Sequence, residues 1–275
     1  MSTLGTTSPP FLLVTGGKGG VGKTTVTANL GIELARAGSQ PVAVDLDFGL
    51  ADLAVVLKLS PEKHVEHFLS GDQPLSNCLT DAPEGLRVLA AGSEARDAGR
   101  DGGRRRRLLE ALRDPVEQAG LLVGDSPAGI GPDVLEFAAE ADRVLLVTTP
   151  EPAALTDAYS VVKAVDAHAR ERGIEVPTPD VFVNLATDAA EARAVVGRLR
   201  SVCERFLCRS PRLLGWMPRS RSVLNASARQ EPFVLSDPKS LAARSIRQLA
   251  KRFSDLATRS GAASLVSQGG SFHDR

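Results

Sequence analysis

The sequence feature that most constrains the fold is a glycine-rich stretch that directly follows a short apolar run. Residues 11–14 are all apolar, and residues 17–25 read Gly-Lys-Gly-Gly-Val-Gly-Lys-Thr-Thr. This stretch contains the pattern Gly-x4-Gly-Lys-Thr, in which a tight loop joins a strand to a helix and its backbone N–H groups surround a phosphate. The start of the helix adds the positive end of its dipole. A nucleotide site is therefore the first hypothesis, with a strand before the loop and a helix from Lys23.

Individual positions of this loop have predicted roles. Lys23 is expected to bridge the outer phosphates of ATP, and the Thr24 hydroxyl to bind Mg²⁺. One subunit does not need a second lysine to hold its own phosphates, so we interpret Lys18 as a charge that reaches the nucleotide of a neighbouring subunit. The other predicted phosphate contacts are Gly17, Gly19, Gly20, Val21, Gly22 and Thr25. The alternative is an ordinary glycine-rich turn between a strand and a helix.

Composition narrows the class of protein. The 275 residues are 43% hydrophobic and 24% charged, as in soluble globular proteins. The 33 Lys and Arg equal the 33 Asp and Glu in number, so no net charge draws the whole molecule to nucleic acid or lipid. The three cysteines lack paired spacing, and neither a signal peptide nor an 18-residue apolar run is present. A cytoplasmic protein is expected.

Short apolar runs alternate with helical patterns along the chain. The predicted strands are 11–15, 41–47, 86–90, 121–125, 143–149, 180–185 and 212–216. The predicted helices are 23–37, 61–69, 104–112, 132–139, 156–172, 189–206 and 238–257. This alternation predicts a doubly wound α/β fold with a mostly parallel sheet of about seven or eight strands, helices on both faces and ligands at the carboxyl ends of the strands.

The same pattern sets the expected domain boundaries. Residues 11–260 are predicted to form a single domain, preceded by a flexible N-terminus, 1–10. Residues 92–103 are expected to be a mobile loop and 261–275 a polar tail.

Two acidic motifs follow predicted strands. Asp45 and Asp47 are two residues apart at the end of one strand, and strand period places them on the same side. Such a pair can hold the water shell of Mg²⁺ and orient an attacking water, or the two acids cap a turn. Asp125 ends another apolar strand and is a second candidate for the Mg²⁺ site. Gly129, in the turn that follows, is predicted to offer its backbone N–H to a terminal phosphate.

Together the three motifs resemble those of the deviant-Walker-A ATPases, the MinD/ParA group of SIMIBI-type P-loop NTPases. This resemblance covers residues 11–257. It implies an ATP-dependent homodimer in which Lys18 reaches the partner's phosphates and Asp47 helps to position the hydrolytic water. It also implies slow hydrolysis that acts as a timer.

Four further stretches resemble one branch of that group, the FlhG (FleN) proteins. They are residues 47–57, 149–159 with Lys163, 214–218 and 229–234. This resemblance implies control of flagellar number or placement, with the GTPase FlhF, a basal-body protein or a flagellar transcriptional activator as partner. The sequence Asp-Ser-Pro-Ala-Gly at 125–129 resembles that of cell-division MinD proteins more than the usual FlhG turn. A division-site ATPase, a DNA-partition ATPase and a binding module that inhibits a transcriptional activator therefore remain alternatives.

The base pocket and the outer surface are less constrained. The resemblance places adenine contacts at Asn184 and Pro218, although Arg219 stands where the family commonly has an acid. Residues 201–260 carry 12 Lys or Arg and 4 Asp or Glu. This excess of positive charge indicates either weak contact with an anionic membrane or a solvated surface, and contact with DNA is less favoured. The run Arg104–Arg107 is expected to be a solvated helix face.

Overall fold

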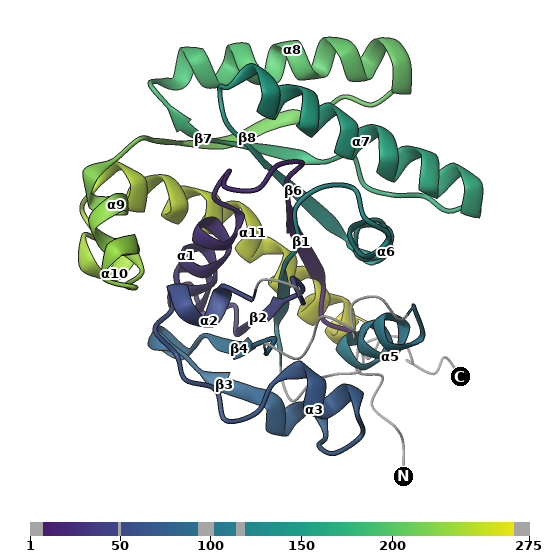
Figure 1. Cartoon of the computed structure of the whole chain (residues 1–275), viewed down its shortest axis with the longest axis vertical. Coiled ribbons are helices and arrows are strands. Elements are labelled where there is room, and N and C mark those ends of the chain that lie inside the picture. Colours follow the sequence, from purple (N-terminus) through teal and green to yellow (C-terminus); the bar gives the residue numbers. More distant parts are fainter. Residues whose placement is uncertain (1–7, 49–50, 93–101, 114–118, 267–275) are drawn as a thin grey trace, which may run out of the picture.

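The predicted apolar runs form a single sheet at the centre of the molecule. The computed structural model describes residues 8–48, 51–92, 102–113 and 119–266, without the side chains of 256–266. In this part of the chain eight strands lie in the order β3-β4-β2-β5-β1-β6-β7-β8 (Figure 1). They are β1 (Phe11–Thr15), β2 (Pro41–Asp45), β3 (Leu79–Asp81), β4 (Arg87–Leu89), β5 (Leu121–Asp125), β6 (Arg143–Thr148), β7 (Asp180–Ala186) and β8 (Arg212–Pro218). Only the β3–β4 pair of this sheet is antiparallel.

Helices cover both faces of the sheet, as the alternation predicted. One face packs against α1 (Lys23–Arg36), α2 (Leu53–Val56), α9 (Arg221–Ala228), α10 (Phe233–Ser236) and α11 (Leu241–Val266). The other packs against α3 (Val65–Leu69), α5 (Gly102–Arg113), α6 (Pro132–Glu140), α7 (Pro152–Arg172) and α8 (Ala189–Leu207), with the short 3₁₀ turn η1 (Leu75–Cys78). A second 3₁₀ turn, η2 (Pro83–Gly85), joins β3 to β4.

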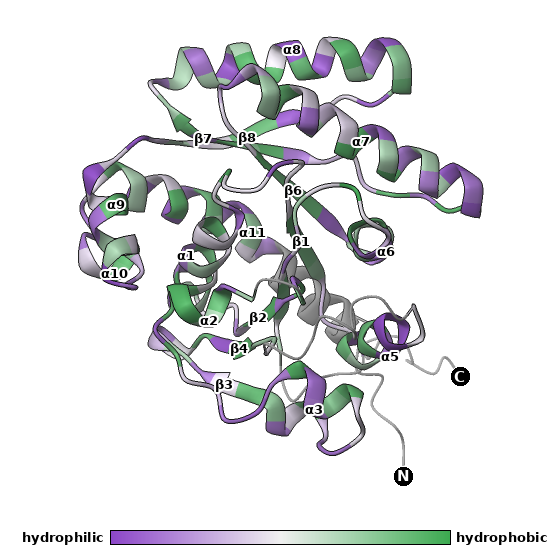
Figure 2. Cartoon of the chain, in the orientation of Figure 1, coloured by the Kyte–Doolittle hydropathy of each residue, from purple (hydrophilic) through white to green (hydrophobic). Residues whose placement is uncertain are grey.

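The strands are hydrophobic on both sides because both sides are covered. In β1, Leu12 and Val14 belong to the core under α1 and α11, whereas Phe11 and Leu13 belong to the core under α5 to α8. Figure 2 shows the same arrangement, with hydrophobic strands inside and mixed colours on the outer helices. A parallel sheet buried in this way reads as continuous apolar runs, which is why the strands were predicted well.

Several predicted boundaries were wrong for local physical reasons. Strand β2 ends at Asp45 rather than at residue 47, because the Asp45 carboxylate accepts backbone hydrogen bonds from the loop that follows. Helix α7 begins at Pro152 instead of Thr156, with proline at its first position, so Thr156 lies inside the helix and donates to the Pro152 carbonyl. Helices α2, α9 and α10 and strand β3 were not predicted.

Three predicted irregular segments also differ from the structure where it describes them. Pro9 and Pro10 are buried, Gly102 and Gly103 begin α5, and α11 continues to Val266 past the predicted boundary at residue 260. Residues 1–7, 93–101 and 267–275 of these segments lie outside the described residues.

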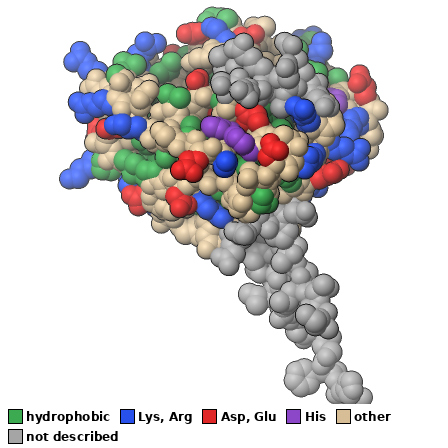
Figure 3. All heavy atoms as spheres, turned by 60° about the horizontal axis from the view of Figure 1, so that its bottom comes forward, with side chains coloured by type: hydrophobic (Ala, Val, Ile, Leu, Met, Phe, Trp, Pro, Cys, Tyr) green, Lys and Arg blue, Asp and Glu red, His purple; other side chains and the backbone are tan. Residues whose placement is uncertain are grey.

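The arginine run at 104–107 does not form a simple solvated face. The Arg105 side chain is 9% exposed and pairs with Glu136 of α6 at 2.7 Å. The Arg107 guanidinium lies 5.0 Å from the centre of the Phe68 ring and donates to the Leu69 carbonyl. These two arginines therefore tie α5 to α6 and α3. On the face shown in Figure 3, basic and acidic side chains are interspersed.

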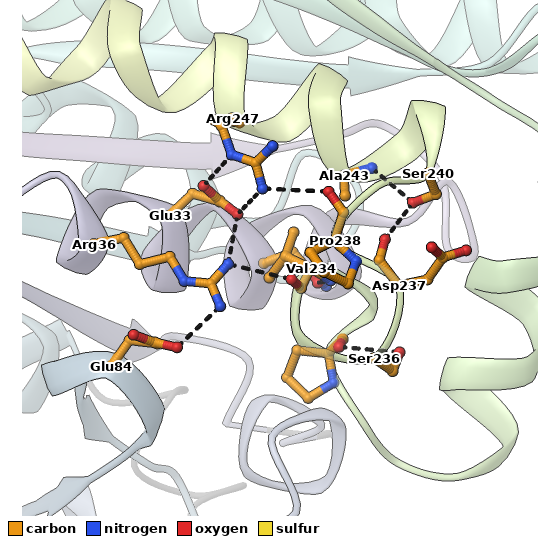
Figure 4. Close-up of polar contacts among 12 residues, drawn as sticks. Glu33, Arg36, Glu84, Val234, Ser236, Asp237, Pro238, Ser240, Ala243 and Arg247 are labelled. Atoms are coloured by element: carbon orange, nitrogen blue, oxygen red, sulfur yellow. Dashed lines mark hydrogen bonds and ion pairs between the residues drawn. The ribbon is translucent and has the colours of Figure 1, made fainter.

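Helix α1 is fastened to the C-terminal helix by a buried carboxylate. Glu33, 4% exposed, accepts hydrogen bonds from two nitrogens of Arg247 in α11 and one of Arg36 (Figure 4). Arg36 also donates to the Val234 carbonyl and to Glu84. This cluster joins α1, α10, α11 and η2, so it fixes the helix that follows the glycine-rich loop.

We expect Glu33→Ala to destabilise the fold. Removal of the carboxylate leaves the positive charges of Arg36 and Arg247 without their shared partner. Because both arginines are partly exposed, we expect a loss of unfolding free energy at the low end of the range for a broken buried ion pair, about 3 kcal/mol. The measurement is the free energy of unfolding in urea. Glu84→Ala, which removes an acid 40% exposed, is the control and should cost at most about 1 kcal/mol. Equal losses of unfolding free energy in the two variants would contradict the stabilising role given to Glu33.

Within the described part of the chain, no helix is both long and apolar enough to cross a bilayer.

Candidate nucleotide site

The glycine-rich loop lies at the carboxyl end of β1 and leads directly into α1. Gly20 and Gly22 have positive φ angles of 79° and 96°, which glycine adopts without strain. Gly22 is the N-cap of α1 and supplies no side-chain hydrogen bond to the first turn. The helix therefore presents its first N–H groups to the loop, where an anion is favoured.

Close packing on both sides fixes the path of this loop. A Cβ on Gly17 would lie 2.3 Å from the Asp157 carbonyl oxygen of α7, and one on Gly22 would lie 2.4 Å from Nδ2 of Asn184. Nδ2 of Asn184 also donates to the Val21 carbonyl at 2.9 Å. Larger side chains at the two glycines would displace backbone or a buried amide, so the loop needs glycine here for space as well as for backbone freedom.

The predicted adenine and terminal-phosphate contacts make bonds inside the chain. Asn184 holds the loop and accepts from the Leu185 N–H, so both ends of its amide are engaged. Gly129 has a φ angle of 97°, and its N–H donates to the Gly16 carbonyl at 3.2 Å. Pro218 ends β8 opposite Ala186. All three lie at the carboxyl ends of the strands, and their contacts with a nucleotide remain predictions.

Lys23 is buried beside the acids that were expected around it. Lys23 is only 8% exposed. This burial lowers the pKa of its ammonium group, while the negative charges of Asp125 and Asp47 raise it. Thr24 hydrogen-bonds the Asp125 carboxylate, and Thr25 lies one position further along α1. The loop lysine, the loop threonine and the strand-end acids are thus brought together.

Asp45 and Asp125 lie opposite each other on the paired strands β2 and β5. Both carboxyls are almost fully buried, and this burial raises the pKa of Asp45 well above its usual value and that of Asp125 to about 6. Two neighbouring buried carboxylates are costly without a cation between them. Oxygen ligands from these acids and from Thr24 suit Mg²⁺. The residues present therefore fit the predicted metal.

Asp45 has a second role that the sequence left open. Its Oδ1 accepts the Asp47 N–H and its Oδ2 accepts the Leu53 N–H, each at 3.1 Å. The carboxylate therefore also caps the turn after β2, as the alternative interpretation proposed for this motif. Asp47 itself is half-buried and close enough to Lys23 to raise the pKa of the lysine.

Lys18 contacts its own chain in this structure. Its Nζ lies 3.1 Å from Glu151 at the start of α7, and the two side chains are 44% and 58% exposed. An exposed pair of this kind contributes at most about 1 kcal/mol, so Lys18 can be released at small cost.

Two residues near the site were not predicted. The Thr27 hydroxyl lies 3.0 Å from both Oδ1 of Asp125 and the Lys23 carbonyl, and Thr27 is fully buried. Its position three residues after Thr24, on the same helix face, was the available signal. Glu151, the partner of Lys18, is 133 residues away in sequence and gave no local signal.

Burial of Asp125 predicts a pH dependence of stability in the absence of metal. Its folded-state pKa of about 6 exceeds the ordinary value of 3.8, so the folded protein binds this proton more tightly than the unfolded chain. The resulting stabilisation is complete below pH 3.8 and is lost as pH rises toward 6. Relative to Asp125→Asn, the wild type should lose about 1 kcal/mol of unfolding free energy between about pH 5 and pH 7. Parallel curves for the two proteins in urea titrations would contradict this.

The fold and the loop define a P-loop NTPase. The family described as "ParA: NUBPL iron-transfer P-loop NTPase" matches residues 9–254. The antiactivator FleN of Pseudomonas aeruginosa is 33% identical over 262 residues, which are 92% of this chain and 89% of FleN. The chain belongs to the ParA/MinD family of P-loop NTPases.

A second relative and a solved structure are also similar to this chain. The flagellum site-determining protein YlxH of Helicobacter pylori is 32% identical over 200 residues, which are 70% of this chain and 64% of YlxH. The solved structure of the septum site-determining protein MinD from Pyrococcus horikoshii, complexed with Mg-ADP, superposes with a TM-score of 0.73. That match covers 92% of this chain and 98% of the other at 23% identity, so it supports the fold.

Proposed function

We propose that this protein is a MinD-like ATPase that controls flagellar number or placement and is switched by ATP-dependent dimerisation. The observation that carries the proposal is the match to FleN over nearly the whole chain, together with the buried acids beside the glycine-rich loop. The name of YlxH refers to the flagellum site, which supports a flagellar role, and the name antiactivator supports a transcriptional activator as partner.

The chain's own residues have distinct tasks in this proposal. The N–H groups of the loop and the start of α1 bind the phosphates, and Lys23 neutralises charge on the outer ones. Thr24, Asp45 and Asp125 hold Mg²⁺, which when bound neutralises charge on the phosphate oxygens. Asn184 and Pro218 border the base. The glycine at 129 can exchange its present bond to Gly16 for a terminal phosphate oxygen, because glycine tolerates either backbone geometry.

Hydrolysis and dimerisation share one set of residues. Lys18 leaves Glu151 and pairs with the phosphates of the second subunit, which exchanges a weak exposed ion pair for a charge-assisted hydrogen bond. Asp47, in the loop that Asp45 caps, orients the attacking water. Slow loss of the terminal phosphate then removes the charge that holds Lys18, and the dimer separates.

The same proposal covers location and partners. A cytoplasmic protein of this kind would act at the inner face of the cell membrane, through FlhF, a basal-body protein or the flagellar activator. The Arg and Lys surplus of residues 201–260 supports weak contact with anionic lipid more than contact with DNA.

The test is flagellar number and position in cells that lack the gene and carry either the wild-type copy or one with Lys23→Ala. We expect the wild type alone to restore both. Minicells would instead identify a division-site ATPase, and plasmid loss a partition ATPase; unchanged flagella on deletion would contradict the proposal.

A further inference from the structure

A groove with an apolar wall lies beside the candidate nucleotide site, between α2 and α9. Its volume is about 170 Å³. Its apolar lining consists of Val55 and Val56 of α2, Val223 and Ala226 of α9, and Phe233 of α10. Thr25 and Asn29 of α1 also line it, so the groove extends to the helix that carries the phosphate-binding lysine.

The apolar wall is partly open to solvent. Of its lining residues, Val55 is 47% exposed, whereas Ala226 and Phe233 are almost fully buried. One water occupies about 30 Å³ in the liquid, so the groove has room for one or two bulky side chains. A complete subunit interface covers about 800 Å² on each partner, far more than this groove offers. Its size fits a short segment.

Polar groups at one side of the groove lack partners. Within the described residues, no hydrogen bond or ion pair involves the side chain of Ser227, Gln230 or Glu231. Glu231 is a partly exposed residue at this side, and within the described residues no ion pair neutralises its negative charge. The charge that complements it is a lysine or an arginine.

We propose that the groove between α2 and α9 is a docking site for a short segment of another protein that carries a bulky apolar side chain next to a lysine or arginine. The apolar side chain enters between Val55 and Ala226, and the cation pairs with Glu231.

Occupation of the groove acts on the nucleotide site through α2. The first N–H of this four-residue helix, at Leu53, is held by Oδ2 of Asp45. The opposite walls are held more firmly: Asn29 accepts the Val234 N–H and donates to the Thr25 carbonyl, and Arg36 binds the Val234 carbonyl (Figure 4). A docked segment therefore moves or steadies α2, and with it Asp45. This consequence for hydrolysis rests on the proposed function, whereas docking itself does not.

The test is selection from a displayed library of random peptides of about twelve residues on the full-length protein with ADP. We expect the selected peptides to share a bulky apolar residue and a nearby lysine or arginine. A synthetic copy should bind the wild type at least about tenfold more tightly than Glu231→Lys. Ala226→Trp, which fills the groove, should also block binding. The control Asp255→Lys makes the same charge change at an exposed position of α11 and should bind like the wild type.

Other outcomes overturn the proposal. They are the absence of selected peptides, a preference for acidic peptides, or equal affinity for the wild type and Glu231→Lys. Loss of ATP-induced dimerisation in Glu231→Lys, with no peptide bound by the wild type, would assign the groove to a second copy of the chain. Peptide affinity is measured with ADP, so a failure of the proposed ATPase or flagellar role would leave this result unaffected.

Discussion

Lys23→Ala should weaken nucleotide binding so far that the protein no longer functions as an ATPase. The residue is 8% exposed in the loop, and in the proposed function its ammonium neutralises charge on the outer phosphates. Loss of hydrogen bonds from a charged donor costs up to about 3 kcal/mol, which corresponds to about 100-fold in affinity. The measurement is the dissociation constant for ADP by titration calorimetry.

Lys18→Ala is the matched control, because it removes a lysine of the same loop that contacts Glu151 instead. It should bind ADP like the wild type. Thermal unfolding of both variants in the absence of nucleotide verifies that they are folded. Full ADP affinity in a folded Lys23→Ala variant would contradict the phosphate-loop assignment.

Asp47→Ala should separate nucleotide binding from hydrolysis. Removal of a group that orients or activates the attacking water slows such reactions by about 10²- to 10⁴-fold. ATP affinity should remain, because the proposed metal ligands Thr24, Asp45 and Asp125 and the proposed phosphate-binding loop are unchanged. ATP should therefore keep this variant dimeric. The measurements are the rate of phosphate release from ATP and the mass of the variant protein in solution with ATP.

Asp52→Ala provides the control for Asp47. Asp52 is exposed, five residues further along the same loop, and makes no side-chain cap bond to α2. Its substitution should change neither rate nor mass. Undiminished hydrolysis by Asp47→Ala would overturn the role given to this acid.

The central part of the fold could be predicted because its signals are local. Strand β1, the loop and the start of α1 are contiguous, and the structure places β1 at 11–15 and the helix start at Lys23, as predicted. The glycine pattern, the apolar run before it and the lysine that opens the helix all lie within fifteen residues or so, so no distant contact was needed to find them.

The short helices could not be predicted in the same way, because distant contacts hold them. The first N–H of α2 is bound by Asp45, eight positions earlier, and α10 is held through Asn29, 205 positions away from Val234. Four-residue helices have too few turns to show a periodic pattern. The antiparallel edge strand β3 has only three residues and no fully buried side chain.

The candidate site, like the fold, could be predicted only in part from the sequence. Which acids gather around Lys23 followed from strand ends that meet at one edge of a parallel sheet. The detailed bonds did not follow: Asp45 also caps the next turn, Asn184 holds the loop, and Gly129 donates to Gly16. Each of these depends on side-chain or backbone direction, which residue type and spacing do not specify.

The most direct test of the shared-site account is the mass of the protein in solution with ATP or ADP and Mg²⁺, measured by sedimentation equilibrium. The experiment uses Asp47→Ala to prevent hydrolysis, with and without Lys18→Ala. We predict a monomer of 29.0 kDa with ADP and twice that mass with ATP, and a monomer in both nucleotides once Lys18 is replaced. The same mass in ATP and ADP, or a dimer that persists without Lys18, would contradict the account.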